Sequence, residues 1–266
     1  MAKIKIYRDR ENNGFYNMAL DEAIFRKAID EKSRDVILRF YDWDPACLSL
    51  GYFQSLKEKI DEKQCDELGI DVVRRPTGGR AVLHDRELTY SVIAPTDKLG
   101  NTTLSAYLNI SKGLNRGLNI LGVKSEISPP KKAKRKGSTA CFDSISSHEI
   151  SVEGKKIVGS AQYRDQGYLL QHGSILIDLD VDKLYRCLKS RADERIKKYF
   201  KKVTTSINDE LNKTITKDEI EKAMIDGFAG YFDFDIYKSG YSEELKKRAN
   251  KLLNEKYNTK EWNYLK

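Results

Sequence analysis

The stretch that decides the fold is Arg74-Arg75-Pro76-Thr77-Gly78-Gly79-Arg80-Ala81-Val82-Leu83-His84-Asp85. Its first two residues end a strand predicted over 70–75, and a strand pattern resumes over 87–94. Two adjacent glycines after a strand let backbone amides approach a ligand closely. The arginines could bind a phosphate or a carboxylate, or they could pair with surface acids around a tight turn. Neither GK[ST] nor GxGxxG follows, so the stretch is neither a P-loop nor a dinucleotide fingerprint.

Strand and helix patterns alternate on both sides of this stretch. Further strands are predicted at the chain start and at 36–41, 47–51, 149–152, 156–158 and 173–179. Helical periodicity predicts helices over 18–29, 56–68 and 104–121 and in the last third. Asn17, Thr216 and Ser242 are the expected N-caps, with Thr216 to Glu219 matching a capping box. We expect one α/β (α+β) domain over residues 1–266, with a mixed sheet flanked by helices.

Composition limits the compartment and the kinds of site. The 266 residues contain no apolar run long enough for a membrane span, and the start lacks a signal-peptide pattern. We therefore expect a cytoplasmic protein with no membrane partner. The four cysteines form no CxxC pair and the three histidines are widely spaced, so neither a disulfide framework nor a metal site is expected.

The formal net charge of +8 favours acidic partners. Nucleic acid is one such partner and an acidic protein domain is another. The densest basic run, 131–136, follows two prolines and contains no aromatic residue. This composition favours a solvated loop over a nucleic-acid site, so no nucleic-acid partner is expected.

Two residues are candidates for covalent chemistry. Cys141 lies in a segment of small residues close to many lysines, and nearby cations favour the reactive thiolate. The other cysteines, Cys47, Cys65 and Cys187, lie in strand or helix patterns that predict inert core positions. Lys156 opens an apolar strand that leads to Gly159-Ser160-Ala161. Lys155 and Lys156 alternate in direction, so at most one of them needs to be buried; the alternative is an exposed hairpin turn.

A further segment, Gln171-His172-Gly173-Ser174, places a His-Gly pair at the start of a strand, where it could line a pocket. A Ser-His-Asp triad is not indicated, because no G-x-S-x-G elbow is present.

Together these motifs resemble the biotin/lipoate protein ligase and lipoyl/octanoyl transferase superfamily. The resemblance runs from Phe15-Tyr16-Asn17-Met18-Ala19-Leu20-Asp21-Glu22, through the Arg-Arg-Pro-Thr-Gly-Gly-Arg motif and 156–162, to Glu261-Trp262-Asn263. Within it, the chain is most similar to octanoyltransferases that move octanoyl from acyl carrier protein to the glycine cleavage H protein. Leu-His-Asp at 83–85, Glu-Leu-Thr-Tyr-Ser-Val at 87–92 and Cys-Phe-Asp at 141–143 carry this closer likeness.

The resemblance implies a ligase-type catalytic core over about 33–246 and a set of site residues. Cys141 would be the thioester nucleophile and Lys156 the active-site lysine. The implied substrate-binding residues are Arg74, Thr77, Gly78, Gly79, Arg80, His84, Gly159, Ser160, Ala161, His172 and Gly173. The implied partners are octanoyl-acyl carrier protein and a lipoyl-carrier protein. No cofactor is implied, and we expect a monomer.

Three alternatives remain at this point. An ATP-dependent lipoate or octanoate ligase would hold an acyl-adenylate in the same motifs and would not need Cys141. Arg80 stands where such ligases typically have a third glycine, and the chain ends soon after Trp262; both features favour the transferase. An amidotransferase of the same superfamily would differ in its octanoyl donor alone. A non-catalytic binding module would function without Cys141.

Overall fold

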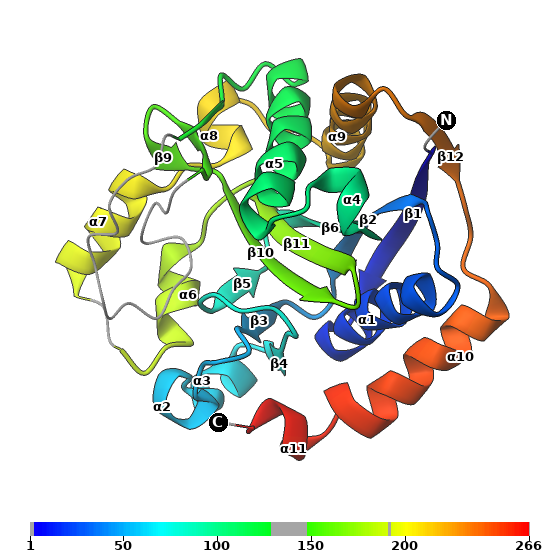
Figure 1. Ribbon diagram of the computed structural model, residues 1–266. Coiled ribbons are helices and arrows are strands. Elements are labelled where there is room, and N and C mark those ends of the chain that lie inside the picture. Colours follow the sequence, from blue (N-terminus) through cyan, green and yellow to red (C-terminus); the bar gives the residue numbers. More distant parts are fainter. Residues whose placement is uncertain (1–2, 129–147, 191–192, 266) are drawn as a thin grey trace.

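The computed structural model describes residues 3–128, 148–190 and 193–265 (Figure 1). Its main sheet has six strands in the order β10 (Val158–Asp165), β11 (Tyr168–Leu176), β6 (Glu87–Pro95), β2 (Val36–Trp43), β1 (Lys3–Asn12) and β12 (Asp235–Lys238). Strand β1 pairs in parallel with both β2 and β12, whereas β2, β6, β11 and β10 pair antiparallel. The sheet is therefore mixed, as predicted.

Helices cover both faces of this sheet (Figure 1). On one face, α5 (Thr103–Ile120) and α9 (Lys217–Phe232) pack over Leu38 and Phe40 of β2. On the other, α1 (Gly14–Asp30) and α10 (Glu243–Leu252) pack over Ile37. The alternation of side chains along β2 thus supplies two separate cores, and the expected sheet flanked by helices is confirmed.

Two smaller sheets extend the structure. One has the order β4 (Asp71–Arg74), β3 (Cys47–Leu50), β5 (Val82–His84), and the other β7 (Glu126–Ile127), β8 (Ile150–Val152), β9 (Lys155–Lys156). The remaining helices are α2 (Leu56–Lys59), α3 (Glu62–Glu67), α4 (Thr96–Leu99), α6 (Val181–Arg186), α7 (Glu194–Val203), α8 (Ile207–Leu211), the π-helical turn Leu253–Tyr257 and α11 (Lys260–Asn263). None of the helices within the described ranges is long and apolar enough to cross a membrane.

Several local predictions are confirmed and three are wrong. One error is the strand expected over 173–179: β11 begins at Tyr168 and ends at Leu176, so the His-Gly pair lies within the strand and not at its start. The capping box at Thr216 and the cap at Ser242 are present. Asn17 is not the N-cap of α1: Asn13 is, and Asn17 lies inside the helix, where its amide donates to the carbonyl of Asp42 at 2.8 Å. The helix expected over 56–68 is interrupted at Ile60, which is buried, extended and bridged to Leu188. Burial of Ile60 against a distant segment therefore overrides the local helical pattern.

Candidate functional site

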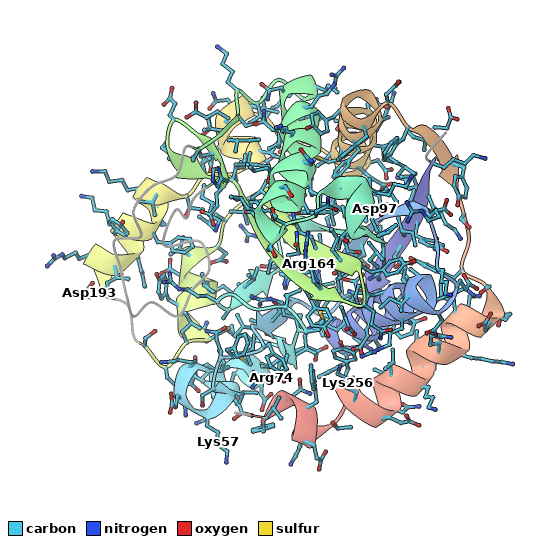
Figure 2. The ribbon with its side chains drawn as sticks, in the orientation of Figure 1. Lys57, Arg74, Asp97, Arg164, Asp193 and Lys256 are labelled. Atoms are coloured by element: carbon cyan, nitrogen blue, oxygen red, sulfur yellow. The ribbon has the colours of Figure 1, made fainter. Side chains whose placement is uncertain are left out.

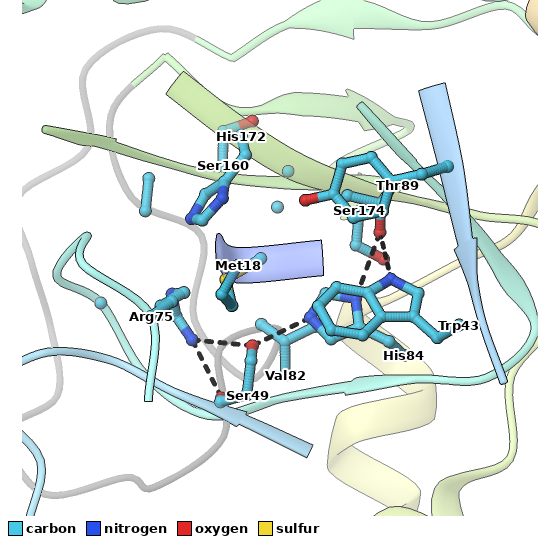
Figure 3. A pocket seen from close by; sticks show the side chains of 15 residues that line it. Met18, Trp43, Ser49, Arg75, Val82, His84, Thr89, Ser160, His172 and Ser174 are labelled. Atoms are coloured by element: carbon cyan, nitrogen blue, oxygen red, sulfur yellow. Dashed lines mark hydrogen bonds between the residues drawn. The ribbon is translucent and has the colours of Figure 1, made fainter. Parts of the chain in front are cut away.

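A narrow cavity lies where the main sheet meets the β4–β3–β5 sheet (Figure 3). Its walls come from α1, from β2, β6, β10 and β11 of the main sheet, and from the small sheet with the turn at 79. The lining residues are Met18, Tyr41, Trp43, Ser49, Arg75, Gly79, Val82, His84, Thr89, Gly159, Ser160, Ala161, His172, Gly173 and Ser174. Seven of the expected binding residues therefore meet here: Gly79, His84, Gly159, Ser160, Ala161, His172 and Gly173.

The buried guanidinium of Arg75 organises one side of the cavity. Its Nε donates to Thr77 Oγ1 at 3.1 Å, and its Nη1 donates to the carbonyl and hydroxyl of Ser49 at 2.9 and 3.0 Å. Its Nη2 donates to the carbonyls of Gly78 and Arg80 at 2.8 and 2.7 Å. A guanidinium has five N–H donors, so these contacts use it as an internal clamp on the Gly78–Arg80 turn.

From Arg75 a chain of hydrogen bonds runs to Asp21. Thr77 Oγ1 lies 2.6 Å from His172 Nε2, and His172 Nδ1 lies 3.3 Å from Asp21 Oδ2. Asp21 also accepts from Arg39 Nη1 at 2.7 Å. An ionised carboxylate only accepts, so Nδ1 of His172 carries the proton and Nε2 accepts from Thr77. Thr77 in turn accepts from Arg75, which fixes the direction of every bond in the chain.

Burial sets the charge states in this chain. It disfavours the charged imidazole and lowers the pKa of His172, although Asp21 acts in the opposite direction. Burial also opposes ionisation of Asp21, but Arg39 and His172 outweigh it and lower the pKa of that carboxyl. At neutral pH, His172 is therefore neutral beside an ionised Asp21.

A second chain with the same order of groups starts from the same arginine (Figure 3). Ser49 Oγ, which accepts from Arg75, lies 2.9 Å from His84 Nε2, and His84 Nδ1 lies 3.1 Å from Glu87 Oε1. The indole of Trp43 stacks on the His84 ring, with ring centroids 4.0 Å apart. Arg75 thus anchors two chains of hydroxyl, imidazole and carboxylate, one to each wall of the cavity.

The hydrogen bonds within these two chains determine which kind of ligand the cavity can bind. Their hydroxyls and imidazoles are engaged with one another, and the same holds for Ser160, whose Oγ lies 2.7 Å from Tyr90 OH. What remains toward the cavity is the surface of Met18, Val82 and the rings of Trp43 and His84, together with the hydroxyl of Ser174, which is buried without a hydrogen-bond partner. Polar groups satisfied in this way cost little next to an uncharged, apolar ligand.

Arg74 lies elsewhere. Its side chain donates to the carbonyls of Gly51, Tyr52 and Gln54 at 3.2, 2.9 and 2.7 Å. It also donates to the carbonyl of Asn263 at 2.8 Å, and the Asn263 side chain accepts from the backbone of Arg74 at 2.8 Å. Arg74 therefore ties the loop at 51–54 to α11 instead of lining the cavity.

The other expected residues of the turn have distinct positions. Thr77 is buried and is not among the residues that line the cavity, but its hydroxyl contacts His172, which does line it. Gly78 borders a neighbouring groove, and the carbonyl of Arg80 is bound by Arg75. Gly51 lies directly beneath the turn, where an added Cβ would come within 2.0 Å of the Gly79 carbonyl oxygen.

Lys156 is buried, as is its partner. The Nζ atom of Lys156 lies 2.5 Å from Glu149 Oε1, and the two residues are 1% and 5% exposed. Lys155 is only partly buried, which confirms that alternation buries one lysine of the pair. The β8–β9 hairpin that carries Lys156 turns at Glu153 and Gly154, both with positive φ (48° and 77°). Lys156 is not among the residues lining the cavity described above.

Cys141 and the basic run at 131–136 lie outside the described residues. The three other cysteines are fully buried, as predicted. Burial also raises the pKa of the Cys47 thiol well above its usual value, which is typical of an inert core cysteine. Among the residues that the structure describes, no group of three or more His, Cys, Asp or Glu side chains could hold a metal ion.

Sequence reasoning missed the groups that support the site. Asp21 and Trp43 received no role, and Glu149 was treated only as part of a strand. Arg75 was quoted with its motif but not chosen over Arg74 and Arg80. One signal was available for Arg75: neighbouring residues of a strand point to opposite faces, so Arg74 and Arg75 could not both face one cavity. The partners of Lys156 and His172 had no sequence signal, because Glu149 and Asp21 are only two among 40 acidic residues.

Comparisons with known proteins agree with this geometry. Residues 13–229 match the family described as lipoyl protein ligase A/B catalytic domain. The chain is 46% identical over 255 residues to octanoyltransferase LipM of Carboxydothermus hydrogenoformans, covering 94% of each chain. It is 40% identical over 270 residues to octanoyltransferase LipM of Clostridioides difficile, covering 99% of each.

Solved structures are similar over the same length. A lipoate-protein ligase A bound with ATP superposes with a TM-score of 0.80 and 26% identity, covering 99% of this chain and 98% of that one. A bipartite lipoate protein ligase from Thermoplasma acidophilum, studied with its E2 lipoyl domain, gives a TM-score of 0.79 and 26% identity, covering 99% and 96%.

Proposed function

The chain belongs to the lipoyl protein ligase A/B catalytic-domain family and is an acyltransferase, and we propose that it transfers an octanoyl group in protein lipoylation. The donor in this proposal is octanoyl-acyl carrier protein. The acceptor is a lysine of a lipoyl-carrier protein such as the glycine cleavage H protein, and the acyl group passes through a thioester on Cys141.

One observation carries the proposal: the polar side chains around the cavity beside the Gly78–Arg80 turn are bonded to one another, with the hydroxyl of Ser174 as the exception. An octanoyl chain needs such a surface, because an unpaired polar group beside it would lose its hydration without compensation. The relatives that are 40–46% identical, all named octanoyltransferases, support the same acyl group. Candidate contacts for the acyl carbonyl are the backbone groups of Gly79, Gly159 and Ser160.

The proposed reaction has two steps. In the first, the Cys141 thiolate attacks the donor's thioester carbon, a new C–S bond forms, and the carrier thiol leaves with a proton. In the second, the acceptor lysine's amine attacks the enzyme thioester, an amide forms and Cys141 is released as a thiol. Exchange of one thioester for another is nearly neutral, and amide formation is downhill, so no ATP is consumed.

Lys156 is the proposed proton carrier in both steps. Its ammonium is held by Glu149, which fixes the position of Nζ. As an ammonium, Lys156 would stabilise the Cys141 thiolate in the first step and give its proton to the leaving carrier thiol. As the resulting neutral amine, it would take the proton of the incoming amine in the second step and pass it to the departing sulfur of Cys141. Glu149 would act as a positioning residue through this contact.

The test is an intact-mass measurement after incubation with octanoyl-acyl carrier protein and no ATP. We expect one octanoyl adduct on the wild type and none on Cys141→Ala. Without such an adduct, and with activity appearing only when ATP and free fatty acid are supplied, the protein would be a ligase and Cys141 would be dispensable. An adduct that the H protein cannot discharge, but another lipoyl domain can, would change the acceptor only.

A further inference from the structure

We propose that a groove beside the acyl cavity is the docking site for the acidic, lysine-bearing tip of the acceptor carrier domain. This inference rests on the proposed function and extends it, because it assigns the surface that recognises the second substrate. The groove lies on the other side of the Gly78–Arg80 turn from the acyl cavity.

The groove has a cavity volume of about 420 Å³. Its apolar walls are formed by Phe25, Tyr52, Phe53, Tyr163, Leu170 and Trp262. A cavity of this volume can hold a long aliphatic side chain, and the rings that line it can pack on one.

The groove adjoins the acyl cavity along two segments. Gly78 lines the groove and Gly79 lines the cavity; likewise Gln162 lines the groove and Ala161 the cavity. An added Cβ at Gly79 would lie 3.9 Å from the Cβ of Ala161. The turn and β10 therefore lie close together where the groove and the cavity adjoin. A lysine lying in the groove would therefore lie next to the cavity proposed for the acyl chain.

The groove already accommodates one lysine of the protein itself. Lys256 Nζ lies 3.9 Å from the centre of a Trp262 ring and 2.6 Å from Glu22 Oε2. Figure 2 labels Lys256 and Arg74, which both contact α11: Lys256 lies over Trp262, and Arg74 donates to the carbonyl of Asn263. An ammonium held by an aromatic face and a carboxylate is the arrangement that a visiting lysine would also need.

Glu22 supplies the carboxylate of this arrangement: its Oε1 accepts from Arg26, and its Oε2 accepts from Lys256 and Tyr257. Burial opposes its ionisation, but Lys256, Tyr257 and Arg26 together lower the pKa of its carboxyl. It is thus a fixed negative charge at the base of the groove, with the cations Arg26 and Lys256 beside it. Two cations against one acid leave the rim positive, and the whole chain carries +8. Acidic side chains next to the target lysine would therefore be attracted.

Phe53 marks the place where the partner would make contact. Its residue is 73% exposed, the highest value among the exposed large hydrophobic residues of the described chain. Its ring lies over Gly78, since an added Cβ there would be 3.9 Å from Phe53 Cδ2. An aromatic ring at the edge of a groove, beside a reacting centre, is a typical anchor for a protein partner.

The experiment separates the two half-reactions in the full-length enzyme. Phe53→Ser is compared with Ile120→Ser, which removes a hydrophobic residue that is 52% exposed at the end of α5. The first half-reaction is enzyme octanoylation from octanoyl-acyl carrier protein, followed by intact mass. The second is single-turnover transfer from the octanoyl-enzyme to apo glycine cleavage H protein at increasing concentrations.

For Phe53→Ser we expect an unchanged first half-reaction and at least a fivefold rise in the H-protein concentration that gives half-maximal transfer. Ile120→Ser should match the wild type in both. If Phe53→Ser and wild type show the same concentration dependence, the groove is not the docking site. If the wild type forms no adduct, the proposed function fails, and direct binding of apo H protein to wild type and Phe53→Ser still decides the inference: equal affinities would overturn it.

Discussion

The ammonium of Lys156 lies 2.5 Å from the carboxylate of Glu149, and both side chains are buried. A buried pair of this kind adds little net stability when it is intact, because both charges have lost their hydration. Removing one partner is different, since the other charge remains buried. Variants of this pair can therefore distinguish an effect on stability from an effect on octanoyl transfer.

Glu149→Gln should lower the free energy of unfolding by about 3 kcal/mol, because it removes the negative charge that Glu149 places against the buried ammonium. Adding Lys156→Met to this variant should restore part of the loss. Urea unfolding of the two single variants and the double variant measures the coupling between them. Strictly additive losses would contradict a direct interaction.

Lys156→Arg keeps the positive charge and so should unfold within about 1.5 kcal/mol of the wild type, while octanoyl transfer falls at least about 100-fold. The physical reason is that a guanidinium does not give up a proton near neutral pH. Transfer rates and unfolding curves from the same preparation check this prediction. A variant that is stable and fully active would exclude proton transfer by Lys156.

The two hydrogen-bond chains from Arg75 predict the tautomers of His84 and His172: each ring carries its proton on Nδ1. Long-range proton–nitrogen NMR spectra can test this directly, because the chain has only three histidines. Thr77→Val should alter the nitrogen shifts of His172 alone, and Ser49→Ala those of His84 alone. A proton on Nε2 of either ring in the wild type would contradict the assigned direction of the bonds.

Stability should fall on mild acidification because of His172. Burial keeps its pKa in the folded protein below the unfolded value of about 6.5. The unfolded chain therefore binds the proton first, and the free energy of unfolding decreases as the pH falls below about 6.5, by up to about 1.4 kcal/mol per unit. His172→Gln should remove this slope and His148→Gln should keep it, as measured by urea unfolding between pH 7.5 and 5.5.

The close contact beneath the Gly78–Arg80 turn gives a matched pair of glycine variants. Gly51→Ala would drive a Cβ to within 2.0 Å of the Gly79 carbonyl oxygen, so it should cost about 1–3 kcal/mol and reduce transfer. An added Cβ at Gly240 meets nothing within 4 Å, so Gly240→Ala should change neither property. Thermal unfolding and transfer assays on both variants provide the comparison.

The helices and strands of this fold could be predicted from the sequence where the signal came from neighbouring residues. The strand patterns at 36–41 and 87–94 predicted β2 and β6, and the capping box at Thr216 predicted the start of α9. The break at Ile60 was missed because its cause is Leu188, which is 128 residues away in the chain and visible only once the chain is folded.

The candidate site divides in the same way. Residues within the motifs, such as Gly79, Ser160 and His172, could be chosen from the sequence and do meet at one cavity. The groups that orient them could not, since Asp21 reaches His172 across 151 positions and Arg39 reaches Asp21 across 18. Pairings of this kind depend on the arrangement of the sheet, which local patterns do not encode.

The brace between Arg74 and Asn263 spans 189 positions. During synthesis, the strand that carries Arg74 leaves the ribosome long before residue 263 has been made. Until then, the arginine lacks its two hydrogen bonds with Asn263, and the loop at 51–54 that it holds has no link to α11. The loop beneath the Gly78–Arg80 turn therefore reaches its final packing only when translation is nearly finished.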